Sequence, residues 1–198
     1  MHIVTALGTG KYGEATYVWP DGRECRTRYF PAALVEWLAP ASVTVLLTSE
    51  AEAHSNWTGF KEEITGRVEV SRRRVPSGQS EEELWRIFSE FTKLPSGEIV
   101  LDITHGFRSL PALALLAAAF LRITGNSTLK QVVYGAHDSK DEAGRSRVFD
   151  LTPFLSLLEW AAAADTFTQT GDARRIAALA RAANNELWRN SDVSNRPH

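Results

Sequence analysis

The spacing of apolar residues changes in a regular rhythm along the middle of the chain. Short runs rich in β-branched residues alternate with longer segments whose apolar residues recur at helical spacing. Four runs are typical of strands: Ser42–Leu47, Val68–Val70, Glu98–Ile103 and Gln131–Tyr134. Three segments are typical of helices: residues 50–64, a segment capped by Ser80, and residues 109–125. Strands that alternate with helices predict an α/β fold with a mostly parallel sheet flanked by helices on both faces.

The N-terminal part predicts a strand followed by a β-hairpin. Residues 15–19 and 25–30 alternate apolar and polar positions on either side of Asp21 and Gly22. An Asp-Gly pair between two alternating runs is a strong hairpin signal. Pro31 then opens a short helix before the first buried-type strand. We therefore expect a Rossmann-like sheet that carries an N-terminal β-hairpin.

The last third of the chain has a different pattern, typical of two helices. Thr152 and Pro153 open the first helix, Gly171 ends it, and the second helix has apolar residues along one side. We expect a Rossmann-like domain over residues 1–150 and a helical segment over residues 151–198. The segment would act as a linker, support a dimer or lead to an effector domain.

Charge and cysteine content exclude several classes of protein. The formal net charge is -2, with 22 Lys and Arg against 24 Asp and Glu, so the chain is not a polybasic coat for long nucleic acids. A small anionic ligand needs only a local pocket of donors. Cys25 is the single cysteine, so an intrachain disulfide is excluded. No cluster of Cys and His has the spacing of a zinc site, and we expect neither a metal nor a cofactor.

Nothing in the hydrophobic pattern predicts a membrane segment. The longest apolar run, residues 110–121, is about a dozen residues and contains Pro111, whereas a bilayer span needs roughly 20 residues. The chain starts without a basic leader or a long hydrophobic region, so we predict no signal peptide. We expect a cytoplasmic protein without membrane contact.

Three segments rich in glycine and polar residues follow predicted strands, at the edge where a parallel sheet places its ligand. The first consists of Gly8, Thr9, Gly10, Lys11 and Tyr12. The second consists of Thr48, Ser49 and Glu50, with Asn56 further on. The third consists of Asp102, Thr104, His105, Gly106, Phe107, Arg108 and Ser109. We expect all of these residues to form one ligand site.

Each segment offers groups that suit a phosphate-bearing ligand. The two glycines of the first let the backbone approach closely, and Lys11 adds a positive charge. Thr48 or Ser49 caps a helix whose N-terminus attracts phosphate. Arg108 can make a forked contact to phosphate. Taken alone, the first segment also fits an ordinary glycine turn and the second fits a plain helix cap. The third holds more polar side chains than a turn between strand and helix requires.

These segments resemble a known family. Asp102-Ile-Thr-His-Gly106 is similar to the DxTHG signature that names a branch of the CRISPR-associated Rossmann-fold (CARF) proteins. Residues 7–12, the hairpin with Thr27 and Arg28, and residues 47–51 also resemble these proteins. The similarity extends over nearly all of the chain, and its most specific element is the Asp-x-Thr-His-Gly motif.

The resemblance implies a ligand, a dimer and a role. CARF domains pair, and a cyclic oligoadenylate made by the type III CRISPR interference complex lies across the two-fold axis. The family implies cyclic tetra-adenylate as the first choice of ligand and cyclic hexa-adenylate as the second. Binding controls an attached or partner effector, most often a HEPN ribonuclease. The residues after Gly171 contain no Arg-x4-6-His motif in a helical context, so we do not expect a HEPN domain there.

Other functions remain as alternatives. The first is a ring nuclease, which would cleave the cyclic ligand by attack of a ribose 2′-hydroxyl, without a metal and with Lys11 and His105 as catalytic residues. A dinucleotide-dependent oxidoreductase is disfavoured because Gly8 and Gly10 are not followed by a helix with a third glycine. A DNA-binding regulator is disfavoured because the arginines of the C-terminal helices form no clear recognition face.

Overall fold

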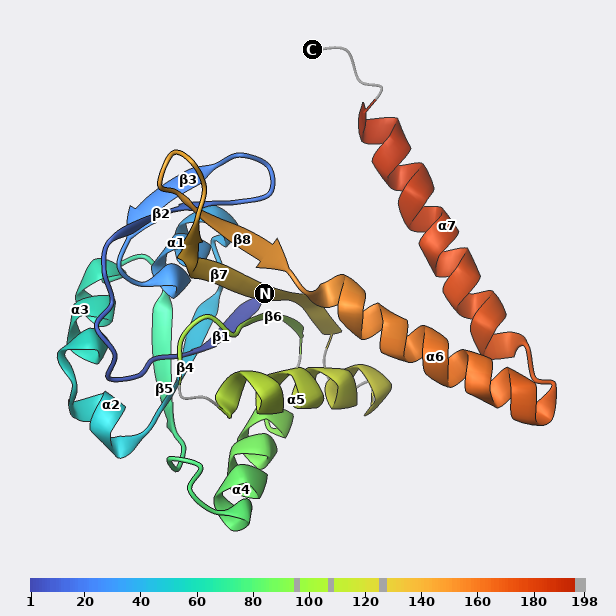
Figure 1. Ribbon diagram of the computed structural model, residues 1–198, viewed down its shortest axis with the longest axis horizontal. Coiled ribbons are helices and arrows are strands. Elements are labelled where there is room, and N and C mark those ends of the chain that lie inside the picture. Colours follow the sequence, from blue (N-terminus) through green and yellow to red (C-terminus); the bar gives the residue numbers. More distant parts are fainter. Residues whose placement is uncertain (95–96, 107–108, 125–127, 195–198) are drawn as a thin grey trace. The chain divides into compact units, whose positions relative to one another are not determined.

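An eight-stranded sheet forms the centre of the structure, a computed structural model that describes residues 1–94, 97–106, 109–124 and 128–194 (Figure 1). The strands lie in the order β3-β2-β8-β7-β6-β1-β4-β5. Their bounds are β1 His2–Ala6, β2 Ala15–Val18, β3 Glu24–Thr27, β4 Ser42–Leu47, β5 Glu69–Arg74, β6 Glu98–Asp102, β7 Thr128–Lys140 and β8 Ser146–Asp150. Strands β5, β4, β1, β6 and β7 run parallel, while β2 with β3 and β7 with β8 form antiparallel pairs. This confirms the predicted mostly parallel sheet and its N-terminal hairpin.

Helices cover both faces of this sheet, because side chains of its central strands point alternately to either side. The helices that follow or connect its strands are α1 Phe30–Leu38, α2 Ser49–Ala53, α3 Ser55–Glu63, α4 Glu81–Thr92 and α5 Leu110–Thr124. Two further helices, α6 Thr152–Thr170 and α7 Arg174–Ser194, come after the last strand. On one face, Ile3 of β1 and Val43 of β4 join a buried cluster with Phe30 of α1 and Phe60 of α3. On the other face lies α5, whose Leu110 packs near Ala6 of β1.

The connections place a topological switch beside β1. After β1 and the β2–β3 hairpin, the chain forms β4 and β5 on one side of β1, and then crosses back to form β6 and β7 on the other side. The loops that follow β1, β4 and β6 therefore leave the same edge of the sheet, at β1 and at the strands on either side of it. This is where open α/β sheets bind their ligands.

The segment predicted as one helix over residues 50–64 forms two helices. His54 lies between them with extended backbone (φ -82°, ψ 150°), and its Nδ1 accepts a hydrogen bond of 3.2 Å from the amide of Asn56. His54 therefore caps α3 and separates it from α2. The apolar pattern along residues 50–64 gives no sign of this break. The predicted strand at 68–70 is also longer, because the arginines that were expected at its exit lie within β5, where Arg72 and Arg74 pair with Glu52.

The antiparallel pair of β7 and β8 was not predicted. Strand β7 continues past Tyr134, and a tight turn returns the chain along β8. Asp141 stabilises this turn, since its Oδ1 accepts hydrogen bonds from the amides of Ala143 and Arg145, and Gly144 supplies a positive φ of 76°. Asp141 and Gly144, just before the alternating run Ser146–Asp150, are the sequence signals from which this hairpin could have been predicted.

The chain divides into two compact units, Met1–Thr152 and Pro153–His198. The second unit consists of α6 and α7, and Gly171 between them has a positive φ of 72°. Asp172 caps α7 by accepting a hydrogen bond from the amide of Arg174. Phe154 and Leu157 of α6 are exposed. None of the described helices is both long and apolar enough to cross a membrane.

Candidate functional site

Asp102, at the end of β6, joins this strand to its neighbour β1. The residue is 2% exposed, and a buried carboxylate needs hydrogen-bond partners. Its Oδ2 accepts from the hydroxyl of Thr5 on β1 (2.6 Å), and its Oδ1 accepts from the amide of Thr104 (2.8 Å). Burial raises the pKa of Asp102 to about 6, although its bonds with Thr104 and Thr5 act in the opposite direction. Asp102 therefore holds its own loop against β1 rather than offering its carboxylate to a ligand.

The loop after β6 turns sharply because Gly106 has a positive φ of 136°. A Cβ at this position would also lie 3.0 Å from Leu110 and 3.5 Å from the Cβ of Ala6. On the other side of the loop, the Thr104 hydroxyl accepts a hydrogen bond of 2.8 Å from the amide of Gly135 on β7. These contacts fix residues 104–106 between β1, β7 and the start of α5.

His105 links this loop to α1. Its Nε2 accepts a hydrogen bond of 3.4 Å from the amide of Phe30, the first residue of α1, and the cap residue Tyr29 supplies no side-chain hydrogen bond there. The ring also stacks on Tyr12, with 4.2 Å between centroids. Burial lowers the pKa of His105 to about 4, and nearby His137 adds to this effect. His105 is therefore neutral at pH 7, with its Nε2 already used as an acceptor.

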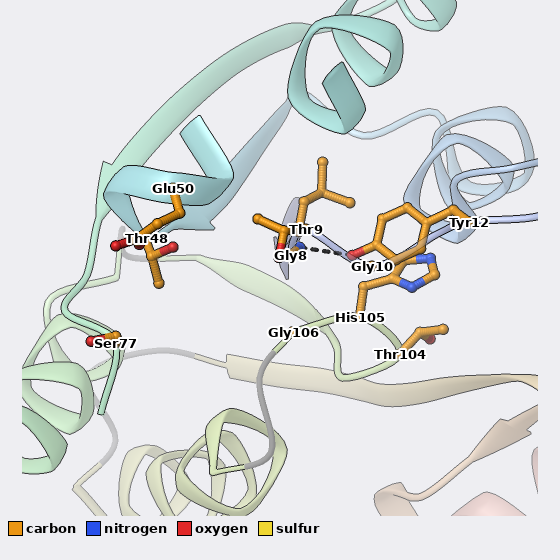
Figure 2. Close-up of a pocket in the computed structure, with 11 residues that line it drawn as sticks. Gly8, Thr9, Gly10, Tyr12, Thr48, Glu50, Ser77, Thr104, His105 and Gly106 are labelled. Carbon is orange, nitrogen blue, oxygen red and sulfur yellow. Dashed lines mark hydrogen bonds between the residues drawn. The ribbon is translucent and has the colours of Figure 1, made fainter. Parts of the chain in front are cut away.

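Two side chains hold the glycine loop after β1: Tyr12 at the end of the same loop and Asn56 of α3. The Tyr12 hydroxyl accepts a hydrogen bond of 2.7 Å from the amide of Gly8, which Figure 2 marks with a dashed line. The buried Asn56 of α3 donates from its Nδ2 to the carbonyls of Gly8 and Gly10, at 2.8 Å each. The backbone of the loop is thus fixed before any ligand binds.

A pocket of about 390 Å³ lies between these loops (Figure 2), and we call it the main pocket. Its lining consists of Leu7, Gly8, Thr9, Gly10, Tyr12, Thr48, Glu50, Ser77, Thr104, His105 and Gly106. In Figure 2, Thr48, Glu50 and Ser77 lie across the pocket from Tyr12 and His105. A hydrogen bond from its own amide, and then one from Thr48, lower the pKa of Glu50. Glu50 is the lining residue that carries a formal charge at neutral pH.

A smaller pocket of about 210 Å³, which we call the side pocket, adjoins the main pocket. Its lining consists of Lys11, Tyr12, Arg28, Thr104, His105, Tyr134, Gly135, His137 and Asp138. Tyr12, Thr104 and His105 line both pockets, so these three residues form the wall between them.

The structure distributes the predicted site residues over several roles. Those that line the main pocket are Gly8, Thr9, Gly10, Tyr12, Thr48, Glu50, Thr104, His105 and Gly106. Lys11 lines the side pocket, whereas Asn56 and Asp102 hold loops in place. Ser49 and Ser109 line neither pocket. Phe107 and Arg108 lie outside the described residues.

Sequence reasoning missed the lining residues that come from other elements. Ser77 follows β5 at the same edge of the sheet, so the rule that found the other loops could have found it. Arg28, His137 and Asp138 reach the side pocket through the two hairpins, one of which was not predicted. Across the described ranges, no three His, Cys, Asp or Glu side chains come together in a group that could hold a metal ion.

Two comparisons with known proteins agree with this geometry. Residues 2–138 match the family described as CRISPR system endoribonuclease Csx1, CARF domain. The CRISPR-associated protein MJ1674 of Methanocaldococcus jannaschii is 34% identical over 110 residues, which cover 53% of this chain and 17% of that protein. The chain thus matches less than a fifth of the length of this relative. The family match includes the loops after β1, β4 and β6.

Replacing Asn56 with Asp tests how the glycine loop is held. The carboxylate cannot donate, so the carbonyls of Gly8 and Gly10 lose their partner and face a negative charge. We expect the free energy of unfolding in urea to fall by about 2–4 kcal/mol. The control is Asn184→Asp, the same change at an exposed position of α7, which should leave stability within about 0.5 kcal/mol. Equal stability of the two variants would contradict this role of Asn56.

The buried His105 predicts a pH dependence of stability. Its pKa of about 4 in the folded protein is below its ordinary value of 6.5, so the unfolded chain binds more protons between these values. The stabilisation is therefore complete above pH 6.5 and is lost as the pH falls toward 4. Asp102 has the opposite effect, because its pKa is raised in the folded protein. Its contribution to stability is present at low pH and is lost as the pH rises through about 6.

A difference measurement separates the two groups. His105→Gln removes the histidine titration but leaves Asp102 in place, so Asp102 cancels when parent and variant are compared. We expect the stability advantage of the parent to shrink by about 2 kcal/mol between pH 7 and pH 5, as measured by urea unfolding. An advantage that is the same at both pH values would show that His105 is not buried as described.

Proposed function

The chain belongs to the family of Csx1-type CARF domains of CRISPR-associated proteins, and from this premise we propose that its main pocket binds a cyclic oligoadenylate. The observation that carries the proposal is the position of the pocket, at the carboxyl edge of the sheet and at its topological switch, within the residues that match the family. Cyclic tetra-adenylate is the preferred ligand, and cyclic hexa-adenylate is the second choice.

The chemistry of the main pocket suits a nucleoside. A volume of about 390 Å³ falls within the range of small-molecule sites. The ring of Tyr12 offers a surface on which a base can stack, and the hydroxyls of Thr48 and Thr104 lie at the same pocket. The glycine loop lets the ligand approach the backbone closely, as in other nucleotide sites.

We propose that two copies of the chain bind one ring. A cyclic ligand with rotational symmetry is matched best by the same pocket presented twice about a two-fold axis. The exposed apolar side chains of Phe154, Leu157 and Leu158 on α6 offer surface that a dimer would cover.

In this proposal the domain is a sensor in type III CRISPR defence that controls an effector. The family description names an endoribonuclease, and the match to MJ1674 covers only 17% of that protein. A sensor of this size would act on an effector that is attached to it or binds it as a partner. We propose that this effector is a ribonuclease.

The second candidate function is a ring nuclease, favoured by the cation that Lys11 places beside the main pocket. In this reaction the ribose 2′-oxygen bonds to the adjacent phosphorus and the bond from phosphorus to the 5′-oxygen breaks. The 2′-hydroxyl proton passes to water, and the 5′-oxygen takes a proton from water. His105 is buried, neutral and engaged with Phe30, which makes it a weak base. Lys11 is therefore the residue to which we assign charge stabilisation in this reaction.

Calorimetric titration tests the proposed binding. We expect cyclic tetra-adenylate to bind at one ring per two chains and more tightly than cyclic hexa-adenylate. Linear tetra-adenylate is the control and should bind more weakly than either ring. Sedimentation of the saturated sample should give the mass of a dimer. Failure of both rings to bind at micromolar protein, or a monomer with and without ligand, would contradict the proposal.

Incubation of excess protein with labelled ring in EDTA tests the second candidate function. A ring nuclease would release linear products that end in a 2′,3′-cyclic phosphate, and Lys11→Ala should slow this release about 100-fold or more. Lys140→Ala, which removes an exposed lysine outside both pockets, is the matched control. A ring that is still intact after hours at saturation would contradict the ring nuclease, and only the sensor function would remain.

A further inference from the structure

The side pocket holds two cationic side chains that are free to meet a ligand. Lys11 follows the glycine loop, and Arg28 follows β3. Both are exposed, and neither makes an ion pair or a side-chain hydrogen bond within the described part of the chain. By contrast Arg26, two residues before Arg28, pairs with Glu14 at 2.6 Å.

The two pockets differ in charge. The side pocket carries two positive charges, on Lys11 and Arg28, against one negative charge on Asp138, so its formal balance is positive. The main pocket carries the negative charge of Glu50. An anionic group is therefore attracted to the side pocket and repelled from the main pocket.

The two pockets also differ in size. A volume of about 390 Å³ accommodates a ligand of the ordinary small-molecule class, whereas about 210 Å³ is below that class. The side pocket has roughly half the volume of the main pocket, which suits a smaller group such as a phosphate.

The wall between the pockets is uncharged. Burial raises the pKa of Tyr12 and lowers that of His105, so both rings are neutral at pH 7 and stack on each other. A ligand can therefore lie over this wall with different groups on either side and meet no charge at the crossing.

We propose that the side pocket is a phosphate subsite, where Lys11 and Arg28 bind a phosphodiester group of a ligand whose adenosine lies in the main pocket. This inference rests on the proposed function, because it assigns the two parts of one ligand to two adjoining pockets. Arg28 contributes a planar fork that suits two phosphate oxygens, and Lys11 contributes a point charge.

The test is the affinity of cyclic tetra-adenylate for the parent, Lys11→Met and Arg28→Met, measured over a series of salt concentrations. Each variant keeps an unbranched side chain and removes one charge. A charge-assisted contact predicts a loss of affinity of roughly 10-fold or more for each variant. Loss of a phosphate contact also predicts a shallower dependence of log affinity on log salt. The matched control is Arg26→Met, which removes the same charge from the same hairpin outside the pocket and should change affinity by less than about 3-fold.

The outcomes distinguish a failure of the phosphate subsite from a failure of cyclic oligoadenylate binding itself. If the parent binds the ring and both pocket variants bind as tightly as Arg26→Met, the phosphate subsite is wrong while ring binding stands. If the pocket variants lose affinity but keep the salt dependence of the parent, their effect is structural and the subsite is also wrong. If the parent binds neither ring, the proposed function fails and the subsite fails with it.

Discussion

The buried carboxylate of Asp102 is the constraint on which the rest of the site depends. It lies at the end of β6 and bonds to Thr5 on β1 and to the amide of Thr104. A carboxylate removed from water must keep such partners, so the two strands beside the topological switch end at a fixed distance and the loop after β6 starts in a fixed direction. The sharp turn at Gly106 and the start of α5 follow from that direction.

Polar side chains also fix the neighbouring loops. His105 caps α1 and stacks on Tyr12, Tyr12 binds the amide of Gly8, and Asn56 holds the carbonyls of the glycine loop. His105 and Asn56 bond to the backbone of segments distant in sequence, whereas Tyr12 bonds within its own loop. The pocket is consequently rigid before binding, which reduces the ordering cost that a ligand must overcome.

Sequence alone predicted the parallel part of the sheet, the N-terminal hairpin and most residues that line the main pocket, because parallel strands bring the loops at their carboxyl ends to one edge. It could not separate lining residues from supporting ones. Asp102 and Asn56 have the chemistry of ligand contacts, and only the fold reveals that Asp102 bonds to Thr5 and that Asn56 bonds to the glycine loop. The side pocket was missed since Arg28 and His137 meet through hairpins whose pairing depends on tertiary contacts.

The central claim is that the loops after β1, β4 and β6 bind the ligand as one surface. Hydrogen exchange of the backbone amides, measured with and without cyclic tetra-adenylate, tests it most directly. The account predicts that exchange slows in residues 8–12, 48–53 and 104–106 together. Exchange should be unchanged in the apolar groove between α4 and α5, which is lined by Leu84, Trp85, Phe88, Leu113, Leu116 and Phe120. Slowing that is confined to that groove or to the turn between β7 and β8 would contradict the account.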